Sequence, residues 1–317
     1  MTDDSHSETL VAEGHIDRVV RVAMKAGLPV MTALQMATIN TAEHFGVSRD
    51  VGMIAPGRWA DLLLVSDLDE LRMDTVLARG VVVAEEGEVR AARPVFSFPD
   101  AARHSVWLPR PLQAADFRIP VRGNGRVRLN VIGVIENQAP TRHLRIDAEP
   151  VDGQLHASLN EDLAKVAVVD RHHGTGAVQM GMVRGFGLSV RCAIGSTVAH
   201  DSHQMLIVGT EDENMALAGN ELARMGGGQV VVREGQVAAR VELPIAGLMS
   251  DEPAKVVAGK AGAVLAALRQ CGCELHNANM QLSLLALVVI PELRISDHGL
   301  VDVNEFRVIP LVEEGGD

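Results

Sequence analysis

The sequence predicts a mixed α and β fold, and three observations support this class. Apolar residues recur at helical spacing over residues 14–45. Residues 46–91 change to short apolar runs separated by Gly-containing turns, which is typical of β-strands. From about residue 146, strand-like and helix-like segments follow one another to the end of the chain. The 317 residues are enough for two or three hydrophobic cores.

Residues 14–45 predict two amphipathic helices. In GHIDRVVRVAMKAG one helical face carries Ile16, Val19, Val20 and Ala23, and Gly27 is a natural stop. In MTALQMATINTAEHFG a second apolar stripe carries Ala33, Leu34, Met36 and Ala37, and it ends at Gly46.

The next two segments predict a small β unit and a connection. ADLLLVSDL indicates a buried strand after the turn PGRWAD. TVLARGVVVAEEGEV predicts two strands around a turn at Arg79-Gly80, and then a second turn at Glu86-Gly87. Residues 92–145 are rich in Pro and Arg, with DFRIPV and GRVRLNVIGVI as candidate strands. We interpret residues 46–91 as the β unit and 92–145 as a segment crossing into a second body.

From residue 146 the pattern predicts an α/β domain. AKVAVVDRHHGTG is a strand followed by a loop, and CAIGSTVAHDSHQMLIVG is a strand, a polar break and another strand. EDENMALAGNELARMGGG predicts a helix with acids at its start and glycines as its stop. A hairpin through Glu234-Gly235 and a second long helix, with Pro253 in its first turn, follow.

Composition excludes several classes of function. A net charge of −12 and an aromatic content of 3% disfavour nucleic-acid binding. The longest apolar run, around LSLLALVVIPEL, is too short for a membrane span, and the acidic start is unlike a signal peptide. The 3 cysteines give no disulfide framework, and CGC is too tight for a zinc knuckle. A reducing cytoplasm is the simplest expectation.

Several segments together resemble a known family. TDDSHSETLVAEGHIDRVV and the following residues to GMIAPGRWADLLLVSDL resemble the end of an amidohydrolase-superfamily barrel. DRHHGTG, VRGFGL, HDSH, LPIAGLMSDEP and PELRISDHGLVDV are similar to the C-terminal domain of bacterial adenine deaminases. The resemblance covers nearly the whole chain and is weakest over residues 92–145.

The resemblance implies a division of the chain into four parts. Residues 1–45 would be the C-terminal end of a (β/α)8 barrel, and 46–91 a small β-sandwich unit. Residues 92–145 would be the crossing segment, and 146–317 the adenine deaminase-like α/β domain. Most of the barrel would precede Met1, or a separate polypeptide would supply it. The expected partners are therefore adenine, the missing barrel and further copies of the chain in a homo-oligomer.

The resemblance also implies a reaction, the hydrolysis of adenine to hypoxanthine and ammonia by a metal-bound hydroxide in purine salvage. The metal would be a divalent ion, manganese or iron, which lowers the pKa of bound water toward about 7. Asp3 matches the family's last-strand Asp, a metal ligand and catalytic proton shuttle. The family's His-x-His, bridging carboxylate and mid-barrel histidines have no counterpart here, so we expect an incomplete site and an inactive isolated chain.

Two groups of residues are thus candidates, and both have a plainer interpretation. On its own, the local sequence DDSH around Asp3 is most typical of a solvated helix cap. The second group lies in two loops that each follow a strand and comprises His172, His173, His200, Asp201 and His203. Such a cluster can bind a metal or the edges of a purine at the catalytic mouth. Alternatively, these are loop histidines satisfied by backbone carbonyls, or contacts with the missing barrel.

The sequence therefore favours an adenine deaminase-like hydrolase. The leading alternative is a non-catalytic remnant or partner subunit that binds purine or the barrel without turnover. A third alternative is a family member that acts on another cyclic amidine or amide.

Overall fold

The computed structural model describes residues 5–92, 96–121 and 125–313. The chain divides into two compact units, residues 1–97 and 98–317. Across the described ranges, every helix is too short or too polar to cross a bilayer.

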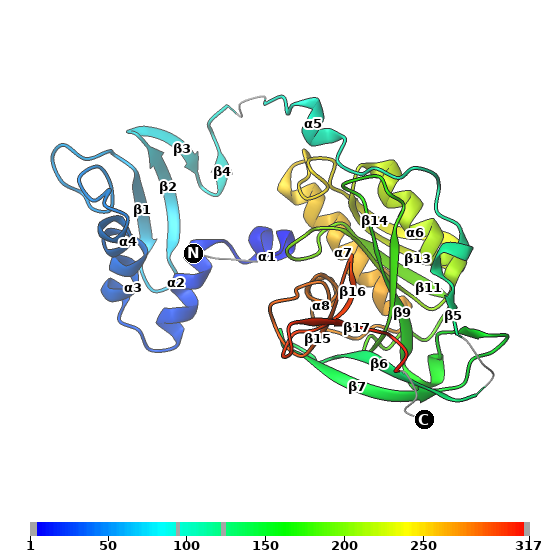
Figure 1. The fold of residues 1–317 in the computed structure, drawn as a ribbon. Helices are drawn as coiled ribbons and strands as arrows, with labels where there is room; N and C mark the ends of the chain where they lie inside the picture. Colours follow the sequence, from blue (N-terminus) through cyan, green and yellow to red (C-terminus); the bar gives the residue numbers. More distant parts are fainter. Residues whose placement is uncertain (1–4, 93–95, 122–124, 314–317) are drawn as a thin grey trace. The chain divides into compact units, whose positions relative to one another are not determined.

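The first unit begins with four short helices, α1 (Ser7–Ala12), α2 (Ile16–Lys25), α3 (Val30–Ala37) and α4 (Ile39–His44) (Figure 1). The first predicted helix is confirmed by α2. The second predicted helix is instead the pair α3 and α4, because the backbone leaves helical geometry at Thr38, with φ −126° and ψ −92°. The Thr38 hydroxyl donates to the Leu34 carbonyl at 2.6 Å, a side-chain bond that competes with helix continuation.

The predicted apolar stripes of these helices are only partly buried. Val20 and Ala33 are buried and pack with Leu71 in one small cluster. Val19 and Met36, from the same predicted stripes, are 38% and 54% exposed. In the described part of this unit, much of the apolar helix surface that was predicted to be buried is therefore exposed.

The same unit contains an antiparallel four-stranded sheet in chain order: β1 (Leu62–Asp67), β2 (Arg72–Ala78), β3 (Val81–Glu85) and β4 (Glu88–Val89). Both predicted turns are confirmed. Arg79 and Gly80 have φ of +49° and +80°, and Glu86 and Gly87 have +52° and +78°. Positive φ at both residues matches the twist of the flanking strands. The strands described here form one sheet, so the β-sandwich stays a prediction.

The second unit is built on an eight-stranded sheet with the order β14-β13-β11-β12-β9-β10-β6-β7. Neighbouring strands are antiparallel except β10 and β6, which are parallel. The strands are β6 (Val127–Val134), β7 (Thr141–Ala148), β9 (Leu163–Val169), β10 (Val178–Arg184), β11 (Cys192–Ser196), β12 (Met205–Gly209), β13 (Gly228–Arg233) and β14 (Gln236–Glu242).

The segment predicted to cross between bodies contributes strands to this sheet. GRVRLNVIGVI forms β6, as predicted, whereas DFRIPV contains only β5 (Ile119–Pro120), which pairs with β8 (Gln154–Leu155). The strand β7 was not predicted, because its polar edge sequence TRHLRIDA has few apolar residues. The division of the chain at residues 45, 91 and 145 stays a prediction.

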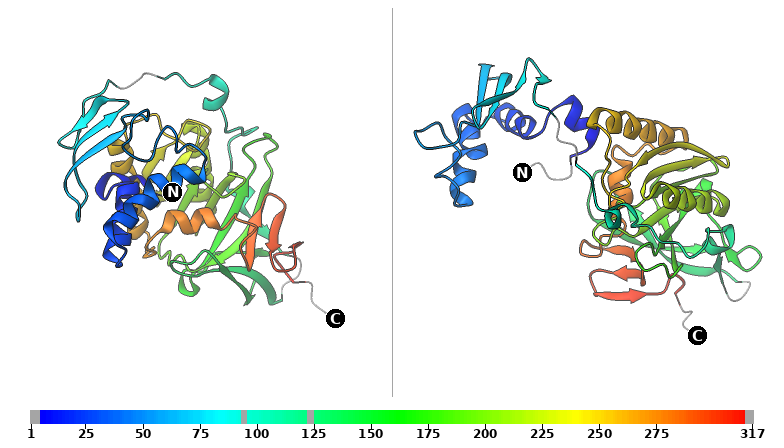
Figure 2. Two further views of the ribbon diagram at one scale, coloured as in Figure 1. Left: turned by 90° about the vertical axis from the view of Figure 1, so that its left-hand side faces the viewer. Right: turned by 90° about the horizontal axis from the view of Figure 1, so that it is seen from above.

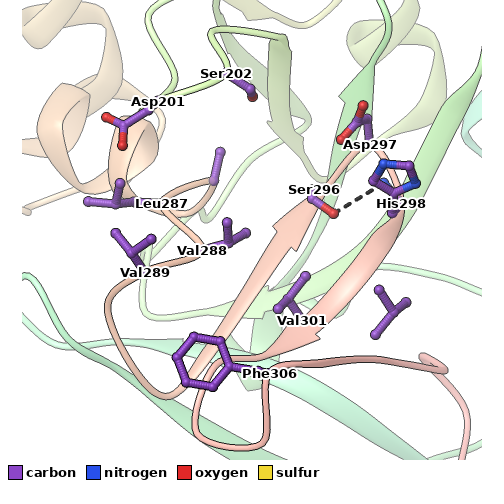
Figure 3. A pocket seen from close by; sticks show the side chains of 12 residues that line it. Asp201, Ser202, Leu287, Val288, Val289, Ser296, Asp297, His298, Val301 and Phe306 are labelled. Atoms are coloured by element: carbon purple, nitrogen blue, oxygen red, sulfur yellow. Dashed lines mark hydrogen bonds between the residues drawn. The ribbon is translucent and has the colours of Figure 1, made fainter.

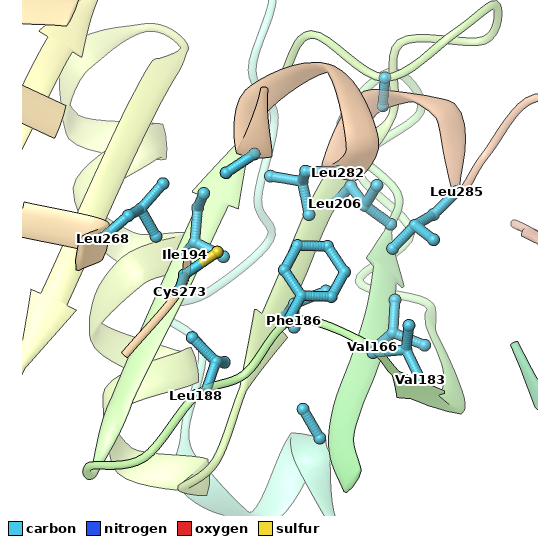
Figure 4. Packing of buried hydrophobic residues seen from close by; sticks show 14 of the residues in the cluster. Val166, Val183, Phe186, Leu188, Ile194, Leu206, Leu268, Cys273, Leu282 and Leu285 are labelled. Carbon is cyan, nitrogen blue, oxygen red and sulfur yellow. The ribbon is translucent and has the colours of Figure 1, made fainter. Parts of the chain in front are cut away.

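Alternating residues of the central strands enter two different cores, so the sheet is covered on both faces. Val166 and Val168 of β9 pack in one cluster, and Ala167 and Val169 pack in the other. The second cluster includes residues of α6 (Asp212–Met225). The first includes residues of α7 (Ala254–Gln270), α8 (Ala278–Leu284) and a small antiparallel sheet of β15 (Leu293–Ser296), β16 (Gly299–Asp302) and β17 (Arg307–Ile309) (Figures 2 and 4).

Both long helices of this unit, α6 and α7, were predicted. Gly226 caps the C-terminus of α6 with φ +77°, so the interpretation of the glycine run as a helix stop is confirmed.

Two strand ends meet at one edge of the large sheet. The strands β9 and β11 both run antiparallel to β12, which lies between them. Val169 at the end of β9 pairs with Met205, and Ser196 at the end of β11 pairs with Leu206. The loop 170–177 and the loop 197–204 therefore leave the sheet at the same edge.

Candidate functional site

The first candidate, Asp3, lies outside the described residues, as does Asp4. The helix that follows begins at Ser7, and its N-cap residue His6 makes no side-chain capping hydrogen bond. The roles of Asp3 as metal ligand and proton shuttle stay predictions.

The second candidate is brought together by the sheet edge. The Nε2 atom of His172 lies 2.9 Å from the Ser202 carbonyl oxygen, which joins the two loops. The rings of His200 and His203 are 5.5 Å apart between centroids. His173 and Asp201 are the outer members, with side chains 76% and 80% exposed. The structure thus gathers His172, His200 and His203, and it leaves His173 and Asp201 at the solvent-facing margin.

The environment of His203 fixes its protonation. The His203 N–H donates to the Ala199 carbonyl at 2.7 Å, and the Ala199 N–H donates back to the His203 Nδ1 at 3.1 Å. Because Nδ1 accepts a hydrogen bond, the neutral ring carries its proton on Nε2. Burial, and then the neighbouring charges of His200 and Arg171, lower the pKa of His203 below its usual value. His203 therefore offers an N–H donor.

His172 complements this donor. A carbonyl oxygen only accepts, so the bond to Ser202 requires a proton on Nε2 of His172 and leaves Nδ1 of the neutral ring as an acceptor. The pair suits recognition of a polar heterocycle better than metal ligation. Within residues 5–92, 96–121 and 125–313, no group of three His, Cys, Asp or Glu side chains is arranged to hold a metal ion. The divalent metal that the family implies does not fit these residues.

Asp170 organises the first loop, and the sequence analysis missed it. Its Oδ1 accepts from the N–H groups of His172 and His173 at 3.1 and 3.2 Å. Its Oδ2 accepts from the N–H and the hydroxyl of Thr175 at 3.0 and 2.6 Å. Burial alone would raise the pKa of Asp170, but these hydrogen bonds outweigh it and hold the pKa well below its usual range. A carboxylate between a strand and a Gly-containing turn was the available signal.

Arg171 joins the two loops to the rest of the unit. Its buried guanidinium donates to the carbonyls of His203, Ser105 and Ala246 at 2.5, 2.9 and 3.1 Å. Its backbone N–H donates to the Gln204 side-chain oxygen at 2.9 Å. Burial lowers the pKa of Arg171 to about 10, so it remains charged at neutral pH. Nothing in the local sequence distinguishes this buried arginine from an exposed one.

Two family models match the chain. The amidohydrolase family matches residues 2–101, and the adenine deaminase C-terminal domain matches residues 138–307. The amidohydrolase match includes the helices and the small sheet of the first unit. The match to the adenine deaminase C-terminal domain includes both histidine loops.

Curated relatives agree with these matches. The adenine deaminases of Ruegeria pomeroyi and Roseobacter denitrificans are each 54% identical to this chain over 98% of its length. The adenine deaminase of Moorella thermoacetica is 50% identical over the same share. In each case the match covers 52% of the relative, so the chain spans about half the length of these proteins. Since the C-terminal domain model alone matches more than half of the chain, the chain belongs to the adenine deaminase family.

Proposed function

We propose that this chain acts as the C-terminal portion of an adenine deaminase, which converts adenine and water to hypoxanthine and ammonia in purine salvage. The observation that carries the proposal is 54% identity to the Ruegeria pomeroyi adenine deaminase over 98% of the chain. A divalent metal, manganese or iron, would activate the water. Asp3 is the ligand that this chain would contribute, and the other ligands would come from the barrel.

We further propose that the histidine loops serve this reaction as a hydrogen-bonding surface at the catalytic mouth. The Nε2–H of His203 and the Nδ1 of His172 give one donor and one acceptor on neighbouring loops. Asp170 and Arg171 hold these loops in place without contacting substrate. The working protein would be a cytoplasmic homo-oligomer whose barrel belongs to the same longer chain or to a separate polypeptide.

The alternative function is a partner subunit that binds purine or the barrel without turnover. The described part of the chain offers no metal-binding group. In this alternative the family fold is retained and the chemistry is not.

A hybrid protein separates the two functions. The N-terminal half of the Ruegeria pomeroyi relative is joined to this chain, and ammonia release from adenine is measured in the presence of Mn²⁺. The proposal predicts metal-dependent turnover. A folded, metal-loaded hybrid that binds adenine and releases no ammonia would support the non-catalytic alternative.

The role of the histidines is tested by supplying the N-terminal half as a separate polypeptide at increasing concentration. His200→Ala and His203→Ala are expected to lower turnover even at saturation. A loss that saturation fully restores would assign these residues to docking. Unchanged activity and docking would make them ordinary loop residues.

A further inference from the structure

The second unit carries a hollow of about 400 Å³ on its surface (Figure 3). Its apolar walls come from residues 286–289, which follow α8, and from the small sheet of β15, β16 and β17. The polar residues in its lining are Asp201, Ser202, Ser296, Asp297 and His298. Protein–protein interfaces combine an apolar centre with a polar rim in this way. The mixed lining therefore suits another protein surface.

Phe306 projects beside this hollow, and it is 83% exposed. It ends the turn between β16 and β17, in which the Glu305 N–H donates to the Asp302 Oδ1 at 3.2 Å. Its φ of +49° is uncommon for a bulky residue. Val289 and Val308, which also line the hollow, are exposed as well. These three apolar side chains and the hollow form one surface, which we call the apolar face.

The apolar face is complementary to itself in shape. It carries a projecting ring next to a recess, and Figure 3 shows Phe306 on the side of the hollow opposite Asp201 and Asp297. About a two-fold axis, the ring of each copy can enter the hollow of the other, so that both contacts form together. A buried aromatic side chain covers about 150–250 Å² and is a typical anchor of an interface.

The charges beside the ring are complementary to themselves too. Glu305 precedes Phe306 and Arg307 follows it, and in the described part of the chain neither charged side chain makes an ion pair. A two-fold axis at Phe306 brings Glu305 of each copy toward Arg307 of the other. Opposite charges that meet in this way fix the register of two surfaces. Both shape and charge therefore favour a second copy of the chain as the occupant.

We propose that the apolar face is the interface between two copies of the chain. Phe306 of each copy fills the hollow of the other, and Glu305 pairs with Arg307 across the two-fold axis. The inference rests on one part of the proposed function, the homo-oligomer, and it assigns the surface that forms it. It does not depend on turnover.

The test is sedimentation velocity of the 317-residue chain carrying Leu63→Glu and Leu64→Glu, which removes two exposed leucines of the first unit as a second route to association. This chain is expected to form a dimer. Phe306→Ser is expected to raise the dissociation constant of the dimer about 30-fold, as the loss of an interface hot spot does. Val151→Ser is the matched control, because it removes an exposed apolar side chain of the same unit that does not line the hollow. It should leave the dissociation constant unchanged.

Charge reversal in the same chain tests the pairing between copies. Glu305→Arg and Arg307→Glu are each expected to weaken self-association about ten-fold or more, because like charges then face each other. Mixing the two variants restores opposite charges across the axis. The mixture is therefore expected to form a mixed dimer about as tight as the dimer without charge reversal.

Three results would overturn the inference. The first is a chain that stays monomeric at high concentration, including one that instead binds the N-terminal half of a relative through Phe306. The second is a dimer that is unchanged by Phe306→Ser and by both charge reversals, which would leave the homo-oligomer standing and refute this interface. The third is a mixture of folded charge-reversed variants that does not associate. None of these results affects the deaminase proposal, which ammonia release by the hybrid protein decides.

Discussion

Replacing Asp170 by Asn perturbs the carboxylate that orders the first histidine loop. An amide keeps one acceptor oxygen in place of two, so the bonds from Thr175 to Oδ2 are lost or reversed. Hydrogen bonds to a charged group contribute about 1.5–3 kcal/mol each. The Thr175 hydroxyl can rotate and recover part of the loss, so we expect destabilisation of about 3 kcal/mol.

Thermal unfolding followed by circular dichroism measures this loss. For a body of this size, about 2–4 °C of melting temperature corresponds to 1 kcal/mol, so a decrease of about 6–12 °C is expected. Asp201→Asn is the control, because that carboxylate is 80% exposed and its distance from the His200 Nδ1 is 3.9 Å. It should change stability by less than about 0.5 kcal/mol.

The effect should also depend on pH. The pKa of Asp170 is lowered in the folded state, so its charge stabilises the fold above the unfolded pKa of about 3.9. This contribution is lost as pH falls through the folded pKa. The difference between wild type and Asp170→Asn should therefore be constant near neutral pH and shrink in strong acid. Equal melting temperatures for the two proteins at neutral pH would refute this account of the loop.

Three further predictions follow from burial and exposure. Arg171→Met should destabilise the chain by about 3 kcal/mol in urea unfolding, because it leaves the partly buried carbonyls of His203, Ser105 and Ala246 without this donor. A stability equal to wild type would show that these carbonyls find other donors. The pKa of His203 is lowered in the folded state, so stability should fall as pH decreases below about 6.5, where the unfolded chain takes up more protons. His203→Gln should make stability depend less steeply on pH in this range. An unchanged pH dependence would contradict a lowered pKa at His203. Leu63 and Leu64 are 53% and 54% exposed, so the isolated chain should self-associate in sedimentation velocity, and Leu63→Glu with Leu64→Glu should reduce the association; a wild-type chain that is monomeric at high concentration would oppose this.

The sequence predicted most of the elements whose periodicity is strong. The helices α2, α6 and α7 follow from apolar spacing and from the glycines that end them. The turns at Arg79-Gly80 and Glu86-Gly87 follow from their glycines, and the structure gives both turns positive φ. The sequence did not predict the break at Thr38. The hydrogen bond from the Thr38 hydroxyl to the preceding helical turn does not alter the spacing of the apolar residues, so the sequence pattern gives no sign of the break. It also did not predict β7, whose polar residues suit an edge strand.

The candidate site divides in the same way. That His172 and His200 lie on neighbouring loops could be expected, because both follow apolar strands. The role of Arg171 could not, since it depends on partners far away in the sequence, Ser105 and Ala246. The role of Asp170 was within reach, because its partners His172, His173 and Thr175 lie in the loop that directly follows it. The tautomer of His203 depends on a single backbone N–H, which no sequence pattern specifies.

The central claim is that this chain carries the adenine deaminase C-terminal domain while the metal site needs ligands from elsewhere. The most direct measurement is ammonia release from adenine by the purified 317-residue chain alone, with bound metal determined after incubation with Mn²⁺ or Fe²⁺. We predict no metal-dependent release of ammonia and no stoichiometric, tightly bound metal. Robust turnover by a metal-loaded preparation free of contaminating deaminase would contradict the account.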